Sequence, residues 1–374
     1  MRRQYAELAR SRLRSGGWSK VLDAGTKVLA PLVPLRGGHA ESGPLLGTVI
    51  LSYACNYRCT FCELPQRSVA RRRQGWTEFD TQGWKDVLRG FAALRTAGVG
   101  FTGGEPFVRK DCAELLEHCL GLGMITHVNT NAHLLDDALV ARLVAMGLDS
   151  VNVSLDGADA ATHDRLRGEP GSFERVTDRI AALARARDAS GASRRTRVAI
   201  TSVLTPDNAE QVVALADLAE RLGADSLGFI PMHEYVGRRQ VAGVAPARPW
   251  AAKMARAVAD LERLKAERTI LENSERYIAL FPSCFAGRPS PVRCRAPETS
   301  LVVDCYGRVF PCVPMSEVDR PIGRVSGAEL ASFWKSDAYA ASRRGLASCR
   351  ACYWNCHTEL NLLWSGRGAG EAVP

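Results

Sequence analysis

The stretch Gly47-Thr-Val-Ile-Leu-Ser-Tyr53 leads, through Ala54, into Cys55-Asn-Tyr-Arg-Cys59-Thr-Phe-Cys62, and the two segments decide how the whole sequence is interpreted. The apolar, β-branched run predicts a buried strand. The C-x3-C-x2-C pattern puts three thiolates on one short loop, where they can converge on a single iron–sulfur cubane. Three protein ligands leave one iron of a four-iron cluster without a protein ligand, so that a substrate or cofactor can bind to it. Catalytic zinc sites differ from structural ones in the same way, because they keep one coordination position open. A zinc loop is the alternative, although a structural zinc normally takes four protein ligands.

The composition is that of a folded protein with an ordinary core. The chain has 374 residues, 46% hydrophobic and 24% charged. Its 49 Lys and Arg against 40 Asp and Glu give a net charge of +9, too mild to indicate nucleic acid, and no stretch interleaves aromatic and basic residues. No long apolar run predicts a membrane-spanning helix, and no secretion signal follows the basic first residues. We therefore expect a cytoplasmic protein, in which the twelve clustered cysteines indicate metal or redox sites.

Between residues 47 and 265, short β-like runs alternate with longer helical runs. This alternation predicts parallel βα units, here six, too few for a closed eightfold barrel. The expected strands are 47–53, 98–102, 124–129, 149–155, 197–204 and 226–231. The expected helices are 79–96, 110–122, 135–146, 173–188, 207–222 and 249–266.

The cysteine loop and three later motifs together resemble the signature of the radical S-adenosylmethionine (SAM) enzymes. Thr102-Gly-Gly-Glu-Pro106 follows the second expected strand and is similar to the family's GGEP segment. Ser154-Leu-Asp-Gly157 ends the fourth expected strand, and two further family motifs follow it, His163-Asp-Arg-Leu-Arg167 and Gly171-Ser-Phe173. One position differs from the family, because Asn131-Ala132 stands where Asn-Gly is more usual. The resemblance covers about residue 45 to residue 356. It implies an α/β fold, a partial (β/α)6 TIM-like barrel at 46–270, with its chemistry at the carboxyl ends of the strands.

The same resemblance implies the cofactors. Cys55, Cys59 and Cys62 would bind a [4Fe–4S] cluster whose open iron chelates SAM. After reduction, SAM would be cleaved to a 5′-deoxyadenosyl radical that abstracts a hydrogen atom from the substrate. A flavodoxin- or ferredoxin-type partner would supply the electron. The residues expected to bind cofactor are Phe61, Gly103, Gly104, Glu105, Asn129, Ser154, Asp156, Arg167 and Met232.

Several of these assignments have a second interpretation. Arg167 is suited to a bidentate carboxylate contact, or is a solvated arginine at the start of a helix. Met232 packs near adenine or belongs to the core. His233 and Glu234 are candidate proton acceptors, or hydrogen-bonded loop residues, and Cys305 is a candidate hydrogen-atom donor. The substrate-facing candidates are Asn129, Asn131, Asp156, Thr201, His233, Glu234 and Tyr235.

The segment 280–360 predicts a second iron–sulfur domain. Residues 299–310 indicate a β-hairpin that turns near Tyr306-Gly307, and 326–344 indicate a helical stretch. The spacing Cys294-x12-Gly307-x4-Cys312, followed by C-x2-C-x3-C at 349–356, is similar to the auxiliary-cluster domains called SPASM and Twitch. Because the full SPASM pattern has more cysteines, the resemblance implies one auxiliary [4Fe–4S] cluster rather than two.

The resemblance makes Cys294, Cys312, Cys349 and Cys352 the best four auxiliary ligands. Three further thiols have open roles: Cys356 can replace one ligand, Cys284 can ligate if its loop folds back, and Cys305 is expected to be a non-ligand. A zinc site at 349–356 is the alternative. Cys112 and Cys119 share an expected helix and are interpreted as small buried apolar residues.

The segments before and after the two predicted domains bear on which class of substrate we expect. Residues 1–45 form a basic extension that caps the barrel or contacts a membrane surface, and 361–374 form a tail. Many peptide-modifying relatives carry a longer domain for leader-peptide recognition. The short extension therefore favours oxidation or epimerisation of a small-molecule biosynthetic intermediate. Modification of a peptide, by a RiPP enzyme or protein maturase, is the first alternative, and a non-enzymatic iron–sulfur electron carrier or scaffold is the second.

Overall fold

The computed structural model describes residues 38, 40, 42–190, 196–233 and 251–365. Most of the expected N-terminal extension, the residues Glu234 and Tyr235, and the last nine residues lie outside these ranges. The predictions made for those residues are therefore neither confirmed nor contradicted by the structure.

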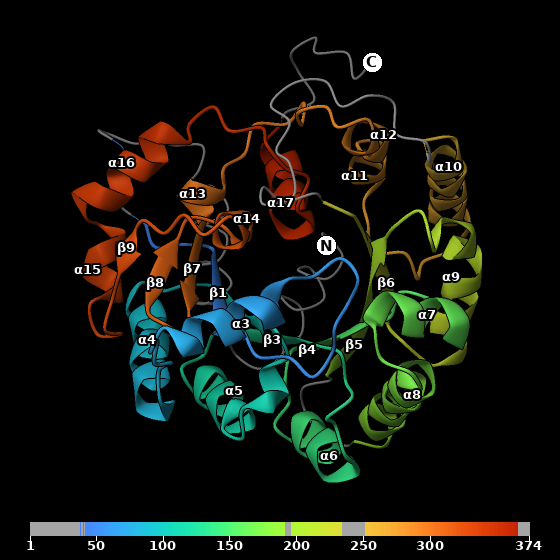
Figure 1. The fold of residues 1–374 in the computed structure, drawn as a ribbon, viewed down its shortest axis with the longest axis horizontal. Helices are drawn as coiled ribbons and strands as arrows, with labels where there is room; N and C mark the ends of the chain where they lie inside the picture. Colours follow the sequence, from blue (N-terminus) through green and yellow to red (C-terminus); the bar gives the residue numbers. More distant parts are fainter. Residues whose placement is uncertain (1–37, 39, 41, 191–195, 234–250, 366–374) are drawn as a thin grey trace.

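Six parallel strands form the body of the molecule, in the order along the sheet that they have along the chain. They are β1 (Leu46–Ser52), β2 (Gly98–Gly103), β3 (Ile125–Thr130), β4 (Ser150–Ser154), β5 (Arg197–Leu204) and β6 (Ser226–Pro231). Each pairs in parallel with the next. The sheet curves without closing, as Figure 1 shows, so the expected partial barrel is confirmed.

The helices between these strands cover the outer side of the curved sheet (Figure 1). They are α4 (Thr81–Ala93), α5 (Cys112–Gly121), α6 (Asp137–Ala145), α8 (Ser172–Ala189), α9 (Val212–Arg221) and α10 (Ala251–Glu267), with the 3-10 turn η4 (Ala209–Gln211) before α9. Asp80 and Asp136 cap α4 and α6 by accepting backbone N–H bonds from Gly83 and Leu139. Cys112 and Cys119 are fully buried in α5, as expected.

Two helices at the mouth of the barrel were not predicted from the sequence, α3 (Leu64–Arg73) and α7 (Ala160–Arg167). The α3 sequence, LPQRSVARRR, has no continuous apolar face, so the helical period is absent from it. In α7, Asp159 caps the first turn and Gly168 ends the helix at a φ of 63°. A short 3-10 turn, η3 (Pro106–Val108), completes this end of the barrel.

The C-terminal segment extends the same sheet. β7 (Ser300–Asp304) pairs in parallel with β1, β8 (Arg308–Phe310) returns antiparallel to it, and β9 (Gly323–Arg324) adds the edge of a nine-stranded sheet. The hairpin predicted at 299–310 is therefore confirmed, but its attachment to the first strand was not foreseen. The domain boundaries remain a prediction.

The helices of this segment are short. They are α11 (Glu275–Ile278), α12 (Phe281–Phe285), α13 (Ala296–Thr299), α14 (Val313–Glu317), α15 (Leu330–Trp334), α16 (Asp337–Gly345) and α17 (Asn355–Trp364). The stretch expected at 326–344 is divided into α15 and α16, because Ser336 caps a new helix through its bond from the Tyr339 N–H. α17 extends four residues into the expected tail. Within the described ranges, every helix is too short or too polar to cross a bilayer.

A buried network ties the hairpin to the first strand and to α3. Tyr53, just after β1, donates a hydrogen bond to Asp304 Oδ2 at 3.0 Å, and Arg308 Nε donates to the same oxygen at 2.7 Å. Asp319, beyond α14, pairs with both Arg308 and Arg71. Charge-assisted bonds of this kind are stronger than neutral ones, so they fix the hairpin and α3 in one arrangement.

Candidate active site

The three-cysteine loop follows β1 at the carboxyl end of the sheet. Inside the loop, the Tyr57 N–H donates to Cys55 Sγ at 3.4 Å, and the Cys62 N–H donates to the Cys59 carbonyl at 3.2 Å. The Thr60 N–H bonds the Leu166 carbonyl at 2.9 Å, which fixes the loop against α7. Two neighbouring helices, α3 and α7, thus hold one compact loop that carries three thiols.

The loop disfavours uncompensated thiolates. Burial, with smaller contributions from neighbouring cysteines, raises the pKa of Cys55 to about 11 and that of Cys62 to about 12. Metal ligands must be thiolates, which crowd negative charge into this loop. A positively charged iron core is the group that would offset it, so the donor set fits the predicted [4Fe–4S] cluster.

Two glycines let the next strand approach this loop closely. A Cβ on Gly103, whose φ is +136°, would lie 2.2 Å from the Ser52 carbonyl oxygen, and a Cβ on Gly104 would lie 2.2 Å from that of Ala54. The Gly104 and Glu105 N–H groups donate to the same two carbonyls at 2.8 Å. The glycines are therefore needed for contact between two parts of the chain, whatever they also contribute to SAM binding.

Glu105 is an organising residue in this structure. Its buried carboxylate accepts bonds from Thr130 Oγ1 at 2.8 Å, the Asn131 N–H at 2.8 Å and the Phe107 N–H at 3.1 Å. Burial raises its pKa to about 7, against the effect of these donors. The contact of this carboxylate with the SAM amine stays a prediction, and its hydrogen bonds hold the ends of β2 and β3 together.

Asn131, just after β3, contacts the cysteine loop, and its predicted contact with substrate stays a prediction. Its Nδ2 donates to Asn56 Oδ1 at 2.9 Å and lies 3.9 Å from Cys55 Sγ. The next residue, Ala132, has a φ of +59° and is fully buried. A left-handed conformation costs a non-glycine residue about 1–2 kcal/mol. This strain explains why glycine is the more usual residue at that position.

Arg167 joins a buried acid to the cysteine loop. Its guanidinium lies 2.7 Å from Asp156 Oδ2, reaches Cys59 Sγ at 3.9 Å, and stands over the Phe61 ring at 5.7 Å from the centroid. Arg167 is buried, so it is not the solvated arginine of the alternative interpretation. Asp156 is fully buried and also accepts the Val203 N–H at 2.8 Å. Asp156 thus holds Arg167 in this structure, and its assignment to cofactor or substrate contact stays a prediction.

This pair gives a stability prediction. Arg167→Leu should lower the free energy of unfolding by about 3–5 kcal/mol, because it leaves the Asp156 carboxylate buried without a partner. Urea denaturation followed by circular dichroism measures the loss. Adding Asp156→Asn should recover much of it, since the amide carries no charge and can still accept the Val203 N–H bond. Equal losses in the single and double variants would contradict the ion-pair explanation.

The inner face of the sheet, opposite the helices, is polar and partly open. Side chains alternate along β3, β4 and β5, so that Asn129, Asn152, Ser154 and Thr201 are half-buried while their neighbours are buried. Asn152 Nδ2 donates to Asn129 Oδ1 at 3.0 Å across adjacent strands. Of the predicted pocket residues, Asn129 and Ser154 therefore lie on this face, and Met232 is half-buried at the end of β6.

The three predicted catalytic residues have different outcomes. His233 Nε2 accepts the Tyr353 N–H at 3.0 Å, which links the end of β6 to the loop between Cys352 and Cys356. That geometry supports the alternative of a hydrogen-bonded residue. Cys305 has no exposed surface and its thiol bonds Glu78, so it cannot meet a substrate in this conformation. Glu234 lies outside the described residues.

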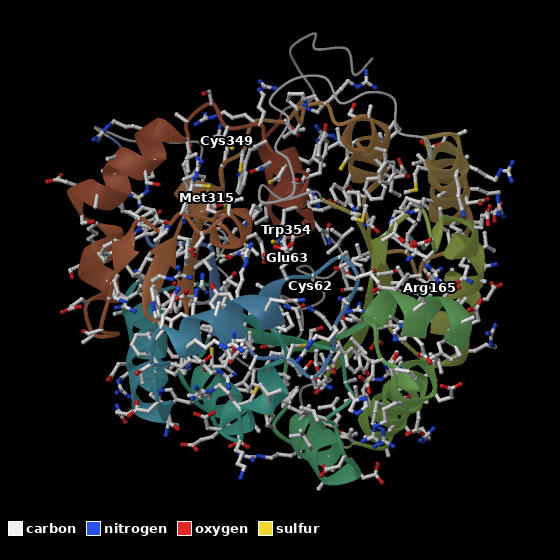
Figure 2. The ribbon with its side chains drawn as sticks, viewed as in Figure 1. Cys62, Glu63, Arg165, Met315, Cys349 and Trp354 are labelled. Carbon is white, nitrogen blue, oxygen red and sulfur yellow. The ribbon has the colours of Figure 1, made fainter. Side chains whose placement is uncertain are left out.

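The structure gathers the auxiliary cysteines from three segments. The Cys294 N–H donates to the Cys349 carbonyl at 2.8 Å, and the two thiols share a hydrogen bond. Burial raises the pKa of Cys312, at the start of α14, and the nearby thiolates of Cys352, Cys349 and Cys356 raise it further. The four expected ligands and a fifth thiol, Cys356, are thus electrostatic neighbours, and which of them would hold an auxiliary cluster stays a prediction. In Figure 2, Met315 and Trp354 are seen between this region, at Cys349, and Cys62.

Comparisons with known proteins agree with this arrangement. A family model described as the radical SAM superfamily matches residues 49–219, and an iron-sulfur cluster-binding domain, SPASM, matches residues 294–357. The PqqA peptide cyclase of Xanthomonas euvesicatoria pv. vesicatoria (strain 85-10) is 27% identical over 315 residues, which are 83% of this chain and 80% of the relative. That of Rhodopseudomonas palustris is 28% identical over 296 residues, 78% of this chain and 74% of the relative.

Solved structures share the fold. Streptococcus suis SuiB superposes with a TM-score of 0.65 at 20% identity, covering 92% of this chain and 79% of SuiB. The protein anSMEcpe with bound AdoMet has a TM-score of 0.58 at 14% identity, covering 85% of this chain and 96% of that chain. The cofactors of this protein are accordingly SAM, a [4Fe–4S] cluster and auxiliary iron–sulfur chemistry. With the cysteine loop, the open barrel and the C-terminal cysteines in place, the chain belongs to the radical SAM superfamily and carries a C-terminal SPASM domain.

Proposed function

We propose that this protein is a peptide-modifying radical SAM enzyme. The observation that carries the proposal is its likeness, over about four-fifths of both chains, to proteins named PqqA peptide cyclase. Streptococcus suis SuiB, which shares the fold, has a structure bound to the precursor peptide SuiA. These relatives favour the peptide alternative over the small-molecule intermediate that the sequence suggested. The small-molecule prediction was based on the length of the segment before residue 46. That length carries no information about the surface of the barrel on which a substrate would bind.

The chain's own residues position the reaction. When bound, the cluster and SAM supply a carbon-centred radical that removes hydrogen from an unactivated C–H bond. Cys55, Cys59 and Cys62 would hold that cluster, and Arg167 supports their loop from below through Asp156. Fixed positioning of this kind is a large part of catalysis, because it replaces a random encounter by an oriented one.

The inner face of the barrel is the surface proposed to hold the peptide. Asn129, Asn152 and Thr201 present amide and hydroxyl groups there, and each is half-buried. Groups of this type can donate to peptide carbonyls and accept from peptide N–H groups.

Mass spectrometry of candidate peptides tests the function. Reconstituted enzyme, SAM and dithionite would be incubated anaerobically with each short peptide encoded beside its gene. One peptide should lose the mass of two hydrogen atoms and yield one 5′-deoxyadenosine per product. Deuterium at the reacting carbon should appear in the 5′-deoxyadenosine. Formation of 5′-deoxyadenosine with every peptide unchanged would contradict peptide modification while leaving the radical chemistry intact. Absence of 5′-deoxyadenosine would point to the electron-carrier alternative.

A further inference from the structure

The helix that follows the cysteine loop exposes unpaired positive charge. α3 has four arginines and no acidic residue, and begins two residues after Cys62. Arg72 and Arg73 are exposed, and neither forms an ion pair within the described part of the chain. Val69 on the same helix is 46% exposed, the more exposed of two large hydrophobic side chains that lie on the surface among the described residues.

The inward side of α3 is already neutralised. Arg71 pairs with Asp319 at 2.7 Å and lies over the Tyr53 ring at 4.6 Å from its centroid. Arg308 pairs with the same Asp319. The acidic Glu317 is half-buried, and burial raises the pKa of its carboxyl group. Arg71 and Arg308 thus make the ion pairs that join α3 to the hairpin. Arg72 only donates a hydrogen bond to Ser68 Oγ within α3, at 3.1 Å, so the positive charges of Arg72 and Arg73 have no such structural role.

Two further exposed arginines lie in the segment that follows the β7–β8 hairpin. Arg320, which follows Asp319, and Arg324 in β9 are both exposed. Arg324 lies over the Trp76 ring, 5.2 Å from its centroid, just beyond the end of α3. We call Arg72, Arg73, Arg320 and Arg324 the α3 arginine face. Basic residues in the last turn of a helix also favour its dipole, by about 0.3–1 kcal/mol, but that effect does not require Arg320 or Arg324.

Figure 1 shows α3 lying across the carboxyl ends of the first strands, beside β7 and β8, with the cysteine loop at its N-terminal end. An electron for the radical cluster must arrive from outside the protein. Arg72 and Arg73 lie in the last turn of α3, so a donor docked there is one helix length, about 15 Å, from Cys62. We propose that the α3 arginine face docks a small acidic one-electron donor protein of the flavodoxin or ferredoxin class. One electron passes from the reduced donor to the enzyme's cluster, the donor is oxidised by one electron, and no bond is made or broken.

This inference rests on the radical SAM chemistry and is independent of the substrate. A peptide substrate needs access to the inner face of the sheet, whereas the arginine face lies on the outer surface of α3. Clustered charge of one sign attracts an oppositely charged partner and raises association rates 10- to 1000-fold at low ionic strength. The complementary partner is therefore a protein with a net negative surface.

The test uses the double variant Arg72→Glu/Arg73→Glu in the full reconstituted enzyme. With flavodoxin kept reduced by its NADPH-dependent reductase, the second-order rate of cluster reduction should fall about tenfold or more at low salt. The difference should shrink in about 1 M salt, where the screening length is about 3 Å. With dithionite, 5′-deoxyadenosine formation should be unchanged. A binding titration with oxidised flavodoxin should show the same loss of affinity without turnover.

The matched control is Arg221→Glu/Arg256→Glu. Both arginines are exposed, and neither forms an ion pair in the described ranges. Arg221 ends α9 at the opposite end of the strands from the cysteine loop. This control should keep the flavodoxin rate. An unchanged flavodoxin rate in the α3 variant, or an equal loss with dithionite, would overturn the proposal. Weaker binding of the precursor peptide with an unchanged flavodoxin rate would assign the face to the peptide instead.

Discussion

Cys59→Ala should reduce 5′-deoxyadenosine formation to the level of the enzyme-free reaction. Cys59 is the middle ligand of the predicted cluster, and its thiol is the one that Arg167 approaches, at 3.9 Å. Without it, two thiols remain in the loop, too few to retain a cluster that needs three. The iron content should fall from about eight to about four atoms per chain, since the auxiliary cysteines are untouched.

Iron and sulfide analysis, with chromatography of the reaction mixture, measures both effects. Cys119→Ala is the matched control, because Cys119 is fully buried in α5 and has no predicted ligand role. That variant should keep its iron and its SAM cleavage. Zinc without sulfide in the unmodified protein, or normal SAM cleavage by Cys59→Ala, would contradict the cluster assignment.

Cys312→Ala should separate SAM cleavage from product formation. Cys312 is buried at the start of α14, among the thiols of Cys349, Cys352 and Cys356. Loss of this ligand should remove the auxiliary cluster and about four iron atoms per chain, while the loop at 55–62 stays intact. We expect SAM cleavage to persist at a reduced rate and the modified peptide to disappear.

Cys356→Ala provides the comparison that identifies the fourth ligand. Cys294, Cys312, Cys349 and Cys352 suffice for one cluster, so loss of the fifth thiol should leave iron content and product unchanged. Loss of the auxiliary cluster in Cys356→Ala would instead make Cys356 a ligand. A normal product yield from Cys312→Ala would show that no auxiliary cluster bound there is essential.

Much of the barrel could be predicted because its signals are local. The six strand predictions each agree with a strand within two residues at either end, since β-branched runs between turns are visible in a short window. α3 was not predicted because its sequence, rich in arginine, lacks the regular spacing of apolar residues that indicates a helix. Its position also depends on an ion pair with Asp319, which lies far along the chain. The pairing of Asp156 with Arg167 could not be predicted from the sequence, because it depends on how α7 folds back onto the end of β4.

The sequence by itself indicated the chemistry: the spacing of three cysteines predicted an iron–sulfur site, and the resemblance of the Gly-Gly-Glu-Pro segment and the second cysteine set to those of radical SAM enzymes implied SAM and an auxiliary cluster. Only the tertiary structure decided which distant groups meet. It joined β7 to β1, paired Asp156 with Arg167, set His233 against the Cys352–Cys356 loop, and left the α3 arginine face uncovered. The physical reason is that spacing reports contacts within a few residues. Pairing across a hundred or more residues depends on how all the buried surfaces pack together.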